Sequence, residues 1–330
     1  MVANKAAIEQ ARRVARDRHA RIQAPSPRSF IELADLTSDE FHALLNRALD
    51  IKQRPQAYES ALANRRVALL FQKTSTRTRV SFETGVSAMG GASLYLDWRS
   101  SNFTLASLQD EIRVLSRYVD LAMARVFRHE DLLIMARHSE VPIINGLSDW
   151  CHPCQALADY MTMQEYFGEL KDLHVVYVGD GNNVCHSLLM GAQHTGSEIT
   201  LCCPRGYAPS GELVHQLTQA GMRIRFESVP QRAVVGADVI YTDTWLSMGE
   251  EQLADQKLRN FAGYQVNEEL FALAESHTLF MHCLPAHRGV EVSDEVMDSS
   301  RSVIFDQAQN RQFAQQALML WLHELAKSSR

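Results

Sequence analysis

Short apolar runs recur along this 330-residue chain and alternate with longer segments in which apolar residues repeat every three or four positions. Short apolar runs bounded by turn residues are typical of buried strands, and the longer repeats are typical of helices. Strand and helix alternate in both halves, so we predict an α/β protein with two doubly wound parallel-sheet domains. The predicted strands are 67–71, 94–96, 121–124, 143–144, 174–178, 199–203, 223–226, 239–242 and 279–282.

Turn and cap residues mark where several predicted helices begin and end. Thr37-Ser-Asp-Glu40 has the sequence of a capping box and opens an amphipathic helix. A second helix follows Ser75 and ends at Gly90-Gly91, where a left-handed cap is needed. The last predicted helix spans about 310–326, has its apolar residues on one side, and is long enough to cross back to the first domain.

The same pattern divides the chain into parts. It restarts beyond Gly168, and Ala24-Pro-Ser-Pro27 has the composition of a linker. We therefore predict an N-terminal arm, two domains, and a C-terminal helix that packs on the first domain. In chain order these parts span 1–27, 28–160, 161–310 and 311–330.

The composition is that of an ordinary globular protein with a formal net charge of −6, which gives no sign of a broad nucleic-acid-binding face. No apolar run approaches the roughly 20 residues of a membrane span. The first 22 residues are rich in arginine but include Glu9 and Asp17, and organelle presequences are poor in acidic residues. We therefore expect a cytoplasmic protein.

The six cysteines are too few and too scattered for a disulfide framework in a chain of this length. Cys151-His-Pro-Cys154 matches the C-x-x-C pattern of zinc and redox sites. A structural zinc site needs a second pair of ligands at a similar spacing, whereas Cys202 and Cys203 are adjacent inside a predicted strand. We therefore predict no metal site.

Chemically active side chains gather at the carboxyl ends of the predicted strands, where open α/β sheets bind their ligands. In the first half they are cationic or rich in hydrogen-bond donors, which suits a phosphate and a polarised carbonyl. In the second half they include a carboxylate, amides and a thiol, which suits a substrate with an amine. Together they suggest acyl transfer from a phosphorylated donor. The first set is Ser75–Thr78, Arg125, His152 and Gln155, and the second is Asn182, Asn183, Asp243, 247–249 and 282–285.

Each of these features also has a simpler structural interpretation. The hydroxyl groups of 75–78 could cap a helix whose arginines are solvated, and His152 could be a turn residue. Asp243 could cap the turn that follows it, and Cys283 could be a small buried apolar residue.

A dinucleotide site is a further alternative. Gly179-Asp-Gly181 follows a predicted strand and resembles the start of a dinucleotide-binding turn. Valine stands at position 184, where the third glycine belongs, and the next strand ends in Cys203-Pro-Arg205 instead of the acidic residue that binds a ribose. Arg205 could instead bind a ribose phosphate, so an NADP-dependent dehydrogenase stays open.

The motifs taken together are far more specific than any one of them. They occur in the order found in transcarbamoylases, and from about residue 28 onwards the chain closely resembles the aspartate/ornithine carbamoyltransferase family. Ser-Thr-Arg-Thr-Arg marks the wider family, and Asp-x-x-x-Ser-Met-Gly with His-Cys-Leu-Pro points to its ornithine branch. The five motifs are Ser75–Arg79, His152–Gln155, Gly179–Asn183, Asp243–Gly249 and His282–Pro285.

The resemblance implies a reaction and an assembly. The first domain would bind carbamoyl phosphate, the second L-ornithine, and the subunits would form a homotrimer or a multiple of trimers. The implied enzyme transfers the carbamoyl group to the δ-amine of ornithine, giving citrulline and phosphate in arginine metabolism, with no cofactor. Lysine or an acylated ornithine stays open as the acceptor.

The resemblance also implies roles for individual residues. Those implied for carbamoyl phosphate are Ser75, Thr76, Arg77, Thr78, Arg125, His152, Gln155, Cys283, Leu284 and Arg311. Those implied for ornithine are Asn183, Asp243, Ser247 and Met248. Those implied to be catalytic are Arg125, His152, Cys283 and Arg311.

One segment departs from the family pattern. Residues 97–105 lie where family members usually place a glutamine or lysine that reaches into a neighbouring subunit's site, and this chain has Ser100-Ser-Asn102 there. The segment is polar with no clear period, so we predict an exposed loop. The departure leaves open how the phosphate is contacted across subunits.

Overall fold

Two parallel β-sheets form the framework of the protein. The structure is a computed structural model and describes residues 27–246, 252 and 254–328. The first sheet has four strands in the order β2-β1-β3-β4, all parallel. Its strands are β1 (Arg66–Phe71), β2 (Ala92–Asp97), β3 (Leu121–Arg125) and β4 (Ile143–Leu147).

The second sheet has five parallel strands in the order β7-β6-β5-β8-β9. Both sheets reverse their strand order once, between β1 and β3 and between β5 and β8, as a doubly wound sheet does. The predicted fold class is therefore confirmed. The strands are β5 (His174–Val178), β6 (Glu198–Cys202), β7 (Ile224–Phe226), β8 (Val239–Thr242) and β9 (Leu279–His282).

Buried side chains alternate along the central strands because successive residues of a strand point to opposite faces of the sheet. In β1, Val67 and Leu69 join one apolar core, while Ala68 and Leu70 join another. The core that contains Val67 extends to the inner face of the second sheet, and each sheet has its own core on the outer face. Burial on both faces explains why these strands are nearly continuous apolar runs.

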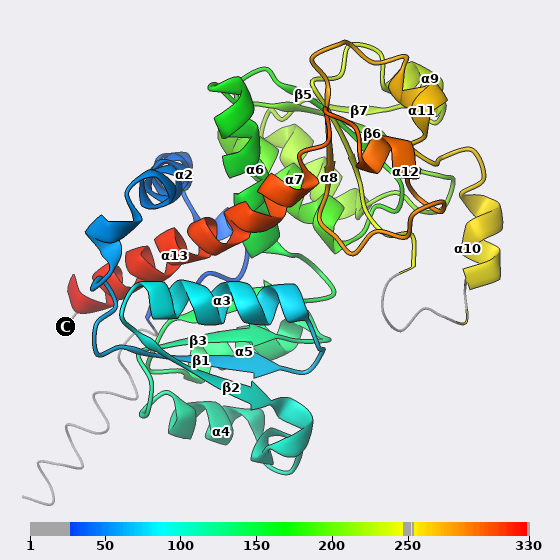
Figure 1. The fold of residues 1–330 in the computed structure, drawn as a ribbon. Coiled ribbons are helices and arrows are strands. Elements are labelled where there is room, and N and C mark those ends of the chain that lie inside the picture. Colours follow the sequence, from blue (N-terminus) through cyan, green and yellow to red (C-terminus); the bar gives the residue numbers. More distant parts are fainter. Residues whose placement is uncertain (1–26, 247–251, 253, 329–330) are drawn as a thin grey trace, which may run out of the picture.

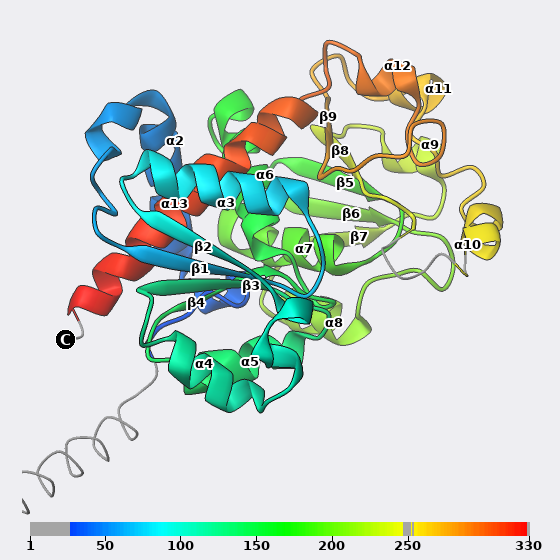
Figure 2. The ribbon, with the colours of Figure 1, turned by 60° about the horizontal axis from the view of Figure 1, so that its bottom comes forward.

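Helices cover both faces of both sheets (Figures 1 and 2). In the first domain α3 lies over one face, and α4 and α5 lie over the other. The longer helices are α2 (Ser38–Gln53), α3 (Thr76–Ala88), α4 (Leu108–Leu115), α5 (His129–His138), α6 (Pro153–Phe167), α7 (Asn183–Thr195), α8 (Gly211–Gln219) and α13 (Ile304–Ser328). The shorter ones are α9 (Pro230–Ala233), α10 (Ala254–Asn260), α11 (Glu268–Phe271) and α12 (Asp294–Met297). Among the helices of the described residues, none is long and apolar enough to cross a membrane.

The C-terminal helix α13 joins the two domains. It contacts β9 near its start and then packs against α6, α2 and α3, as predicted (Figure 1). It begins at Ile304, earlier than the predicted start near residue 310. The prediction missed the first turns because the buried Gln307 interrupts the apolar pattern that marks a helix. Residues 314–320 are all buried, so the prediction of a single apolar side is wrong there. The middle of the helix is therefore covered by other helices, whereas residues nearer its ends, such as Phe305 and Glu324, are exposed.

The predicted helix caps are present. Thr37 Oγ1 accepts a hydrogen bond from Glu40 N at 3.2 Å, and the Glu40 carboxylate accepts one from Thr37 N at 2.9 Å. Gly90 has φ = +74°, and a Cβ at that position would lie 2.8 Å from Glu59 O, so glycine is required after α3. The predicted domain boundary at 160 falls inside α6, and its position stays a prediction.

Residues 97–105 form two 3₁₀ turns, Trp98–Ser100 and Asn102–Thr104. Trp98 and Phe103 are buried in the outer core of the first domain, with their ring centroids 4.8 Å apart. The prediction of an exposed loop is therefore wrong for these two aromatic residues, because the lack of a period hid their burial. It holds for Ser100 and Asn102, and Leu105 is 85% exposed.

Candidate active site

The first half of the site lies where β1 passes into α3. Ser75 is the N-cap of α3, and its Oγ accepts a hydrogen bond from Thr78 N at 3.2 Å. Thr78 is fully buried. The simple interpretation of this segment as a helix cap is therefore correct as far as Ser75 is concerned. Free N–H groups at a helix N-terminus favour an anion.

Two arginines from distant parts of the chain meet at Thr78. Arg311 Nη2 of α13 donates to Thr78 Oγ1 at 2.9 Å, and Arg125 Nη1 at the end of β3 lies 3.4 Å from the same oxygen. Ser75 Oγ also donates to that oxygen, at 3.1 Å. A hydroxyl oxygen has only two lone pairs, so three donors exceed what it can satisfy. The arrangement has room for a further acceptor, such as a phosphate oxygen.

The guanidinium groups of this half repel one another. Burial and the nearby Arg311 and Arg77 lower the pKa of Arg125 to about 9, and burial also lowers the pKa of Arg311. The Nε atoms of Arg77, Arg125 and Arg311 are buried and have no hydrogen-bond partner in the described part of the chain. An anion bound among them would neutralise the repulsion and accept from these donors. Arg77 is half-buried with its Nε atom enclosed, so it is only partly solvated.

His152 and Gln155 lie at the start of α6, beside the arginines. Burial, and then the charges of Arg311 and Arg125, hold the pKa of His152 well below its usual range, so its imidazole is neutral. Its Nδ1 atom and the Oε1 atom of Gln155 are buried without a partner among the described residues. A neutral imidazole and an amide can orient an uncharged acyl group without adding charge to the site.

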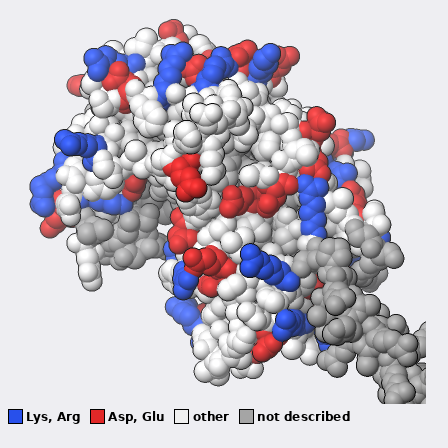
Figure 3. Space-filling view, turned by 180° about the vertical axis from the view of Figure 1, so that it is seen from behind, with Lys and Arg blue, Asp and Glu red and all other residues white. Residues whose placement is uncertain are grey.

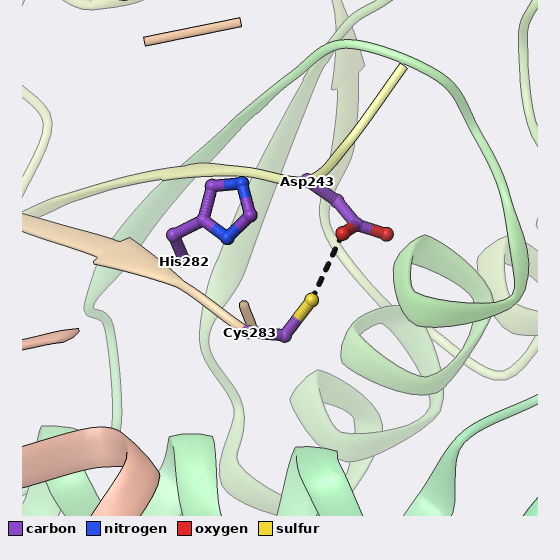
Figure 4. A group of neighbouring side chains, drawn as sticks. All are labelled: Asp243, His282 and Cys283. Atoms are coloured by element: carbon purple, nitrogen blue, oxygen red, sulfur yellow. Dashed lines mark hydrogen bonds between the residues drawn. The ribbon is translucent and has the colours of Figure 1, made fainter. Parts of the chain in front are cut away.

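Asp243 and Cys283 form the second half, at the ends of β8 and β9 (Figure 4). Cys283 Sγ donates to Asp243 Oδ1 at 2.9 Å, and Asn182 Nδ2 donates to Asp243 Oδ2 at 2.6 Å. Burial and the carboxylate of Asp243 hold the pKa of Cys283 well above its usual range, so the thiol keeps its proton. Asp243 also accepts from Thr244 N at 2.7 Å, as its interpretation as a turn cap requires.

The side chains of Asp243, His282 and Cys283 could in principle hold a metal ion, since their ligand atoms lie within 4.8 Å of one another. The chemistry of the three groups fits a metal poorly. The thiol is held protonated, His282 Nδ1 accepts a hydrogen bond from Leu284 N at 2.8 Å, and His282 Nε2 faces Glu291 Oε1 at 3.4 Å. Metal ligation would require a thiolate and a free imidazole nitrogen. The absence of a metal site stays a prediction.

The two halves are joined by hydrogen bonds between the segment 148–152 and the first turns of α7. Asn183 Nδ2 donates to Ser148 O at 2.6 Å, and His152 N donates to Ser187 Oγ at 2.7 Å. Asn183, predicted to bind ornithine, is thus bonded to the segment that leads to His152. Its neighbour Asn182, which contacts Asp243, was not among the predicted binding residues. An Asn-Asn pair after a strand was the signal for both.

The structure brings together most of the predicted residues but not all. Thr76 is exposed on the first turn of α3, and Leu284 is half-buried just after β9, with φ = +57°. Ser247 and Met248 lie outside the described residues. Asp159, a fully buried carboxylate that accepts from Gln155 Nε2 at 2.8 Å, was not among the predicted residues. Its signal is a charged residue one turn after Gln155, in the mainly apolar first half of α6.

A separate cavity of about 940 Å³ lies next to the segment 148–152. Its lining includes carboxylates, the Trp150 ring and apolar side chains of α7 and α8, but none of the predicted catalytic residues. Acidic side chains also gather across the middle of the face opposite that of Figure 1 (Figure 3). The carboxylates that line the cavity are those of Glu32, Glu130 and Asp149.

The fold and the site define a two-domain α/β protein with an anion site in the first domain and a carboxylate–thiol site in the second. The chain belongs to the aspartate/ornithine carbamoyltransferase family. Residues 28–165 match the carbamoyl-P binding domain of this family, and residues 171–322 match its Asp/Orn binding domain.

Several ornithine carbamoyltransferases are similar to this chain over about 90% of its length. The ornithine carbamoyltransferase of Pyrococcus horikoshii is 45% identical over 302 residues, which are 89% of this chain and 95% of that protein. That of Haloquadratum walsbyi is 44% identical over 90% of this chain and 98% of that protein. The solved structure of ornithine carbamoyltransferase from Pyrococcus furiosus superposes with a TM-score of 0.85 at 44% identity, covering 89% of this chain and 96% of that one.

Proposed function

We propose that this protein is an ornithine carbamoyltransferase, which transfers the carbamoyl group of carbamoyl phosphate to the δ-amine of L-ornithine. The products are L-citrulline and phosphate, which belong to arginine metabolism. The observation that carries the proposal is the convergence of Arg125 and Arg311 on the Thr78 hydroxyl, with the charge of Arg77 close to both. The names of relatives with about 44% identity over about 90% of the chain support the same reaction.

Carbamoyl phosphate would bind across the first half of the site. Ser75, Thr76, Arg77 and Thr78 would hold the phosphate at the N-terminus of α3, where N–H groups and guanidinium forks suit its oxygens. The carbonyl oxygen of the carbamoyl group would face the buried donors Arg125, His152 and Arg311. Gln155 would contact the carbamoyl group through its Oε1 atom, and Cys283 and the Leu284 carbonyl would lie on the far side.

Ornithine would bind in the second half, with its α-amino and α-carboxylate groups held by Asn183, Asp243, Ser247 and Met248. The Asp243 carboxylate is the natural partner for an ammonium group, and it already accepts from Asn182 and Cys283. Asn183 would have to exchange its bond to Ser148 O for one to the substrate. Ornithine binding would in this way be coupled to the contact between the two domains.

The proposed reaction is a single acyl transfer. The lone pair of the δ-amine attacks the carbamoyl carbon, the C–N bond forms, and the carbonyl becomes an oxyanion. The C–O bond to phosphate then breaks, and the departing phosphate takes the electron pair and one proton of the amine. Arg125 and His152 would stabilise the oxyanion, an effect worth about 3 kcal/mol for one donor. Arg77 and Arg311 would stabilise the leaving phosphate.

The attacking amine must lose a proton before it can react. A free alkylamine has a pKa of about 10.4, so at neutral pH only a small fraction is uncharged. Placing the amine beside three guanidinium groups would lower its pKa and favour the neutral form. The site would in addition hold the two substrates in attack geometry, which turns a bimolecular step into a unimolecular one.

We further propose that the active protein is a cytoplasmic homotrimer or a multiple of trimers. Residues 99–104 of one subunit would complete the carbamoyl phosphate site of the next. Leu105, Val80 and Leu94 are exposed apolar residues of the first domain and would supply part of the interface.

The direct test is an acceptor panel with carbamoyl phosphate, in which phosphate release and product are both measured. L-Ornithine should be used with the highest kcat/KM and should yield citrulline. Lysine, acetylornithine and aspartate serve as competing acceptors. A higher kcat/KM for any of these than for ornithine would reject ornithine as the substrate. If no acceptor in the panel, ornithine included, gave phosphate release, carbamoyl transfer to an amino acid would be rejected.

A further inference from the structure

A fully buried carboxylate beside the active site has no role in the reaction described above. Asp159 lies on α6, one turn after Gln155, and is 0% exposed. It accepts hydrogen bonds from Gln155 Nε2 at 2.8 Å, Gln307 Nε2 at 2.7 Å and Tyr241 OH at 3.1 Å. A buried carboxylate with three donors is a costly feature, since burial disfavours its charge.

The three donors belong to three different elements. Gln155 lies on α6, Gln307 on the first turns of α13, and Tyr241 in β8 of the second sheet. Gln307 Oε1 in turn accepts from His282 N at 3.0 Å. Asp159 therefore connects Gln155 with the segment that holds Cys283, through a single intermediate side chain.

The connection sets the orientation of the Gln155 amide. An ionised carboxylate can only accept hydrogen bonds, so Gln155 must turn its NH₂ group toward Asp159. Its Oε1 atom then points away from Asp159 and is buried without a partner among the described residues. An unpaired buried acceptor is costly unless a ligand supplies the donor. The NH₂ of a carbamoyl group is such a donor.

We propose that Asp159 is a positioning residue that holds the Gln155 amide with its oxygen toward the carbamoyl nitrogen and links this orientation to the segment 282–283. This role rests on the proposed function, because carbamoyl phosphate is the substrate that supplies the NH₂ group. With the amide reversed, the NH₂ group of Gln155 would face the NH₂ group of the carbamoyl moiety, and neither could accept a hydrogen bond from the other. Asp159 itself would touch neither substrate.

Asp159 titrates near neutral pH, and its ionised form predominates above that pH. Burial raises the pKa of Asp159 to about 7, and the hydrogen bonds from Gln155, Gln307 and Tyr241 act against that rise. The charge of Asp159 also favours the charged form of Arg311, whose pKa burial lowers. The positive group that acts on Asp159 is Arg311, on the side of the site.

The first test is Asp159→Leu. Gln155 Nε2 and Gln307 Nε2 both donate to Asp159 Oδ1, and leucine has a similar size but no acceptor. The variant therefore removes the acceptor that holds the Gln155 NH₂ group. At saturating ornithine, kcat/KM for carbamoyl phosphate should fall at least ~10-fold, whereas KM for ornithine should change less than ~3-fold. Equal loss for both substrates would contradict the positioning role.

A double-mutant cycle separates positioning from general support of the fold. If Asp159 acts through Gln155, adding Asp159→Leu to Gln155→Ala should lower kcat/KM for carbamoyl phosphate by less than ~3-fold more. Losses that multiply would show that Asp159 acts independently of Gln155 and would overturn the proposal. Tyr241→Phe is the matched control, because it removes one donor to Asp159 but leaves both amide bonds. It should lower Tm and leave kcat/KM for carbamoyl phosphate within ~3-fold.

A second variant covers the case in which Asp159→Leu does not fold. Asp159→Asn keeps the shape of the side chain and an Oδ1 atom with two lone pairs, so it can still accept from Gln155 and Gln307. This variant should fold and keep kcat/KM for carbamoyl phosphate within ~3-fold of the unaltered protein. A folded Asp159→Asn protein with a ~10-fold loss would overturn the role of Asp159.

The same measurements distinguish this role from the proposed function. The unaltered protein reports on the function, since citrulline formation from ornithine must be present before any variant is compared. If another amine proves to be the acceptor, the cycle is measured with that amine, and the expected ratios are unchanged. If carbamoyl phosphate is not a substrate at all, the donor for Gln155 is lost and both proposals fall together.

Discussion

At the scale of the residue, one short segment serves both the fold and the site. Ser75 caps α3 through Thr78 N, and the Thr78 hydroxyl receives Arg311 and Arg125. The simple interpretation as a helix cap and the functional one are therefore both right for this segment. The arginines are different, because their mutual repulsion and burial have a cost that only a bound anion offsets.

Arg77→Ala should lower kcat/KM for carbamoyl phosphate at least ~100-fold, because a charge-assisted fork to the phosphate is lost. Its Tm without substrate should be equal or higher, since one of three repelling charges is removed. Enzyme kinetics and thermal unfolding of the same preparations measure both effects.

Arg79→Ala is the matched control for this prediction. Arg79 lies two residues further on in α3, is bonded to Glu83 at 3.0 Å, and packs over the Tyr95 ring. Its loss should leave kcat/KM within ~3-fold and lower Tm slightly. If Arg77→Ala had near-normal kinetics, residues 75–79 would have to be interpreted as a helix cap without a role in phosphate binding.

Asp159 should make stability depend on pH. Its pKa is about 7 in the folded protein and about 3.9 in an unfolded chain, so between these values the folded state holds a proton that the unfolded state has lost. The contribution of Asp159 to the free energy of unfolding therefore falls as pH rises from about 4 to about 7, by a few kcal/mol at most. Above pH 7 both states are ionised and the contribution is constant.

Thermal unfolding of the unaltered protein and of Asp159→Asn at pH 5 and pH 8 isolates this effect. The unaltered protein should lose more Tm than the variant on going to pH 8, because only it must keep a buried carboxylate ionised. Carboxylates with lowered pKa, such as Glu40, act in the opposite direction and are common to both proteins. Parallel pH profiles would show that Asp159 stays ionised throughout.

At the scale of the element, the turn between β5 and α7 is held by close backbone packing. A Cβ at Gly181 would lie 2.6 Å from the carbonyl carbon of Ala208 and would overlap Pro209 N. Gly181 N also donates to Tyr207 O at 2.8 Å. The glycine in this dinucleotide-like turn is thus needed for contact with the segment 207–209.

Gly181→Ala should therefore displace the turn and with it Asn182, which donates to Asp243. We expect KM for ornithine to rise at least ~10-fold and KM for carbamoyl phosphate to change less than ~3-fold. Gly211→Ala, in the first turn of α8, is the control, since a Cβ there has no atom within 4 Å. It should leave both KM values unchanged. A rise in both KM values for Gly181→Ala would indicate general unfolding of the domain.

At the scale of the whole molecule, the two domains share one apolar core. The inner faces of both sheets, with α2, α6, α7 and α13, contribute to it. The site lies where the domains meet, because Arg311 comes from α13 and reaches Thr78 in the first domain. The relative position of the domains therefore sets the distance between the two halves of the site.

The proposed trimer can be tested by mixing two inactive proteins. One is Arg77→Ala, and the other has Ser100, Ser101 and Asn102 replaced by alanine. After subunit exchange of equal amounts, about a quarter of the sites should combine an intact arginine with an intact loop, since trimer contacts are head-to-tail. Activity should return to about a quarter of that of the unaltered protein.

Two outcomes would contradict the shared site. The loop variant could be fully active by itself, or the exchanged mixture could stay inactive although mixed trimers are present. Ser100 and Ser101 donate to the carbonyls of Asp97 and Trp98, so the Tm of the loop variant must be measured as well. A lower Tm would indicate that the substitutions unfold the loop, and inactivity would then say nothing about a contact with the neighbouring subunit.

The sequence by itself determined the two sheets, the caps and the family. Apolar runs mark strands because both faces of these sheets are buried, and cap residues act on neighbouring backbone groups, so both signals are local. The motif at 75–79 and the motif at 282–285 were recognised from order and spacing alone.

Only the tertiary structure decided which polar residues share an environment. Asp159, Gln307 and Tyr241 are far apart in the chain, and no periodicity marks a buried carboxylate as a partner of a distant amide. The aromatic residues at 98 and 103 and the all-round burial of α13 were likewise hidden, because burial there comes from contacts with other elements. Long-range packing, and not local pattern, places the charges of Arg125 and Arg311 around one hydroxyl.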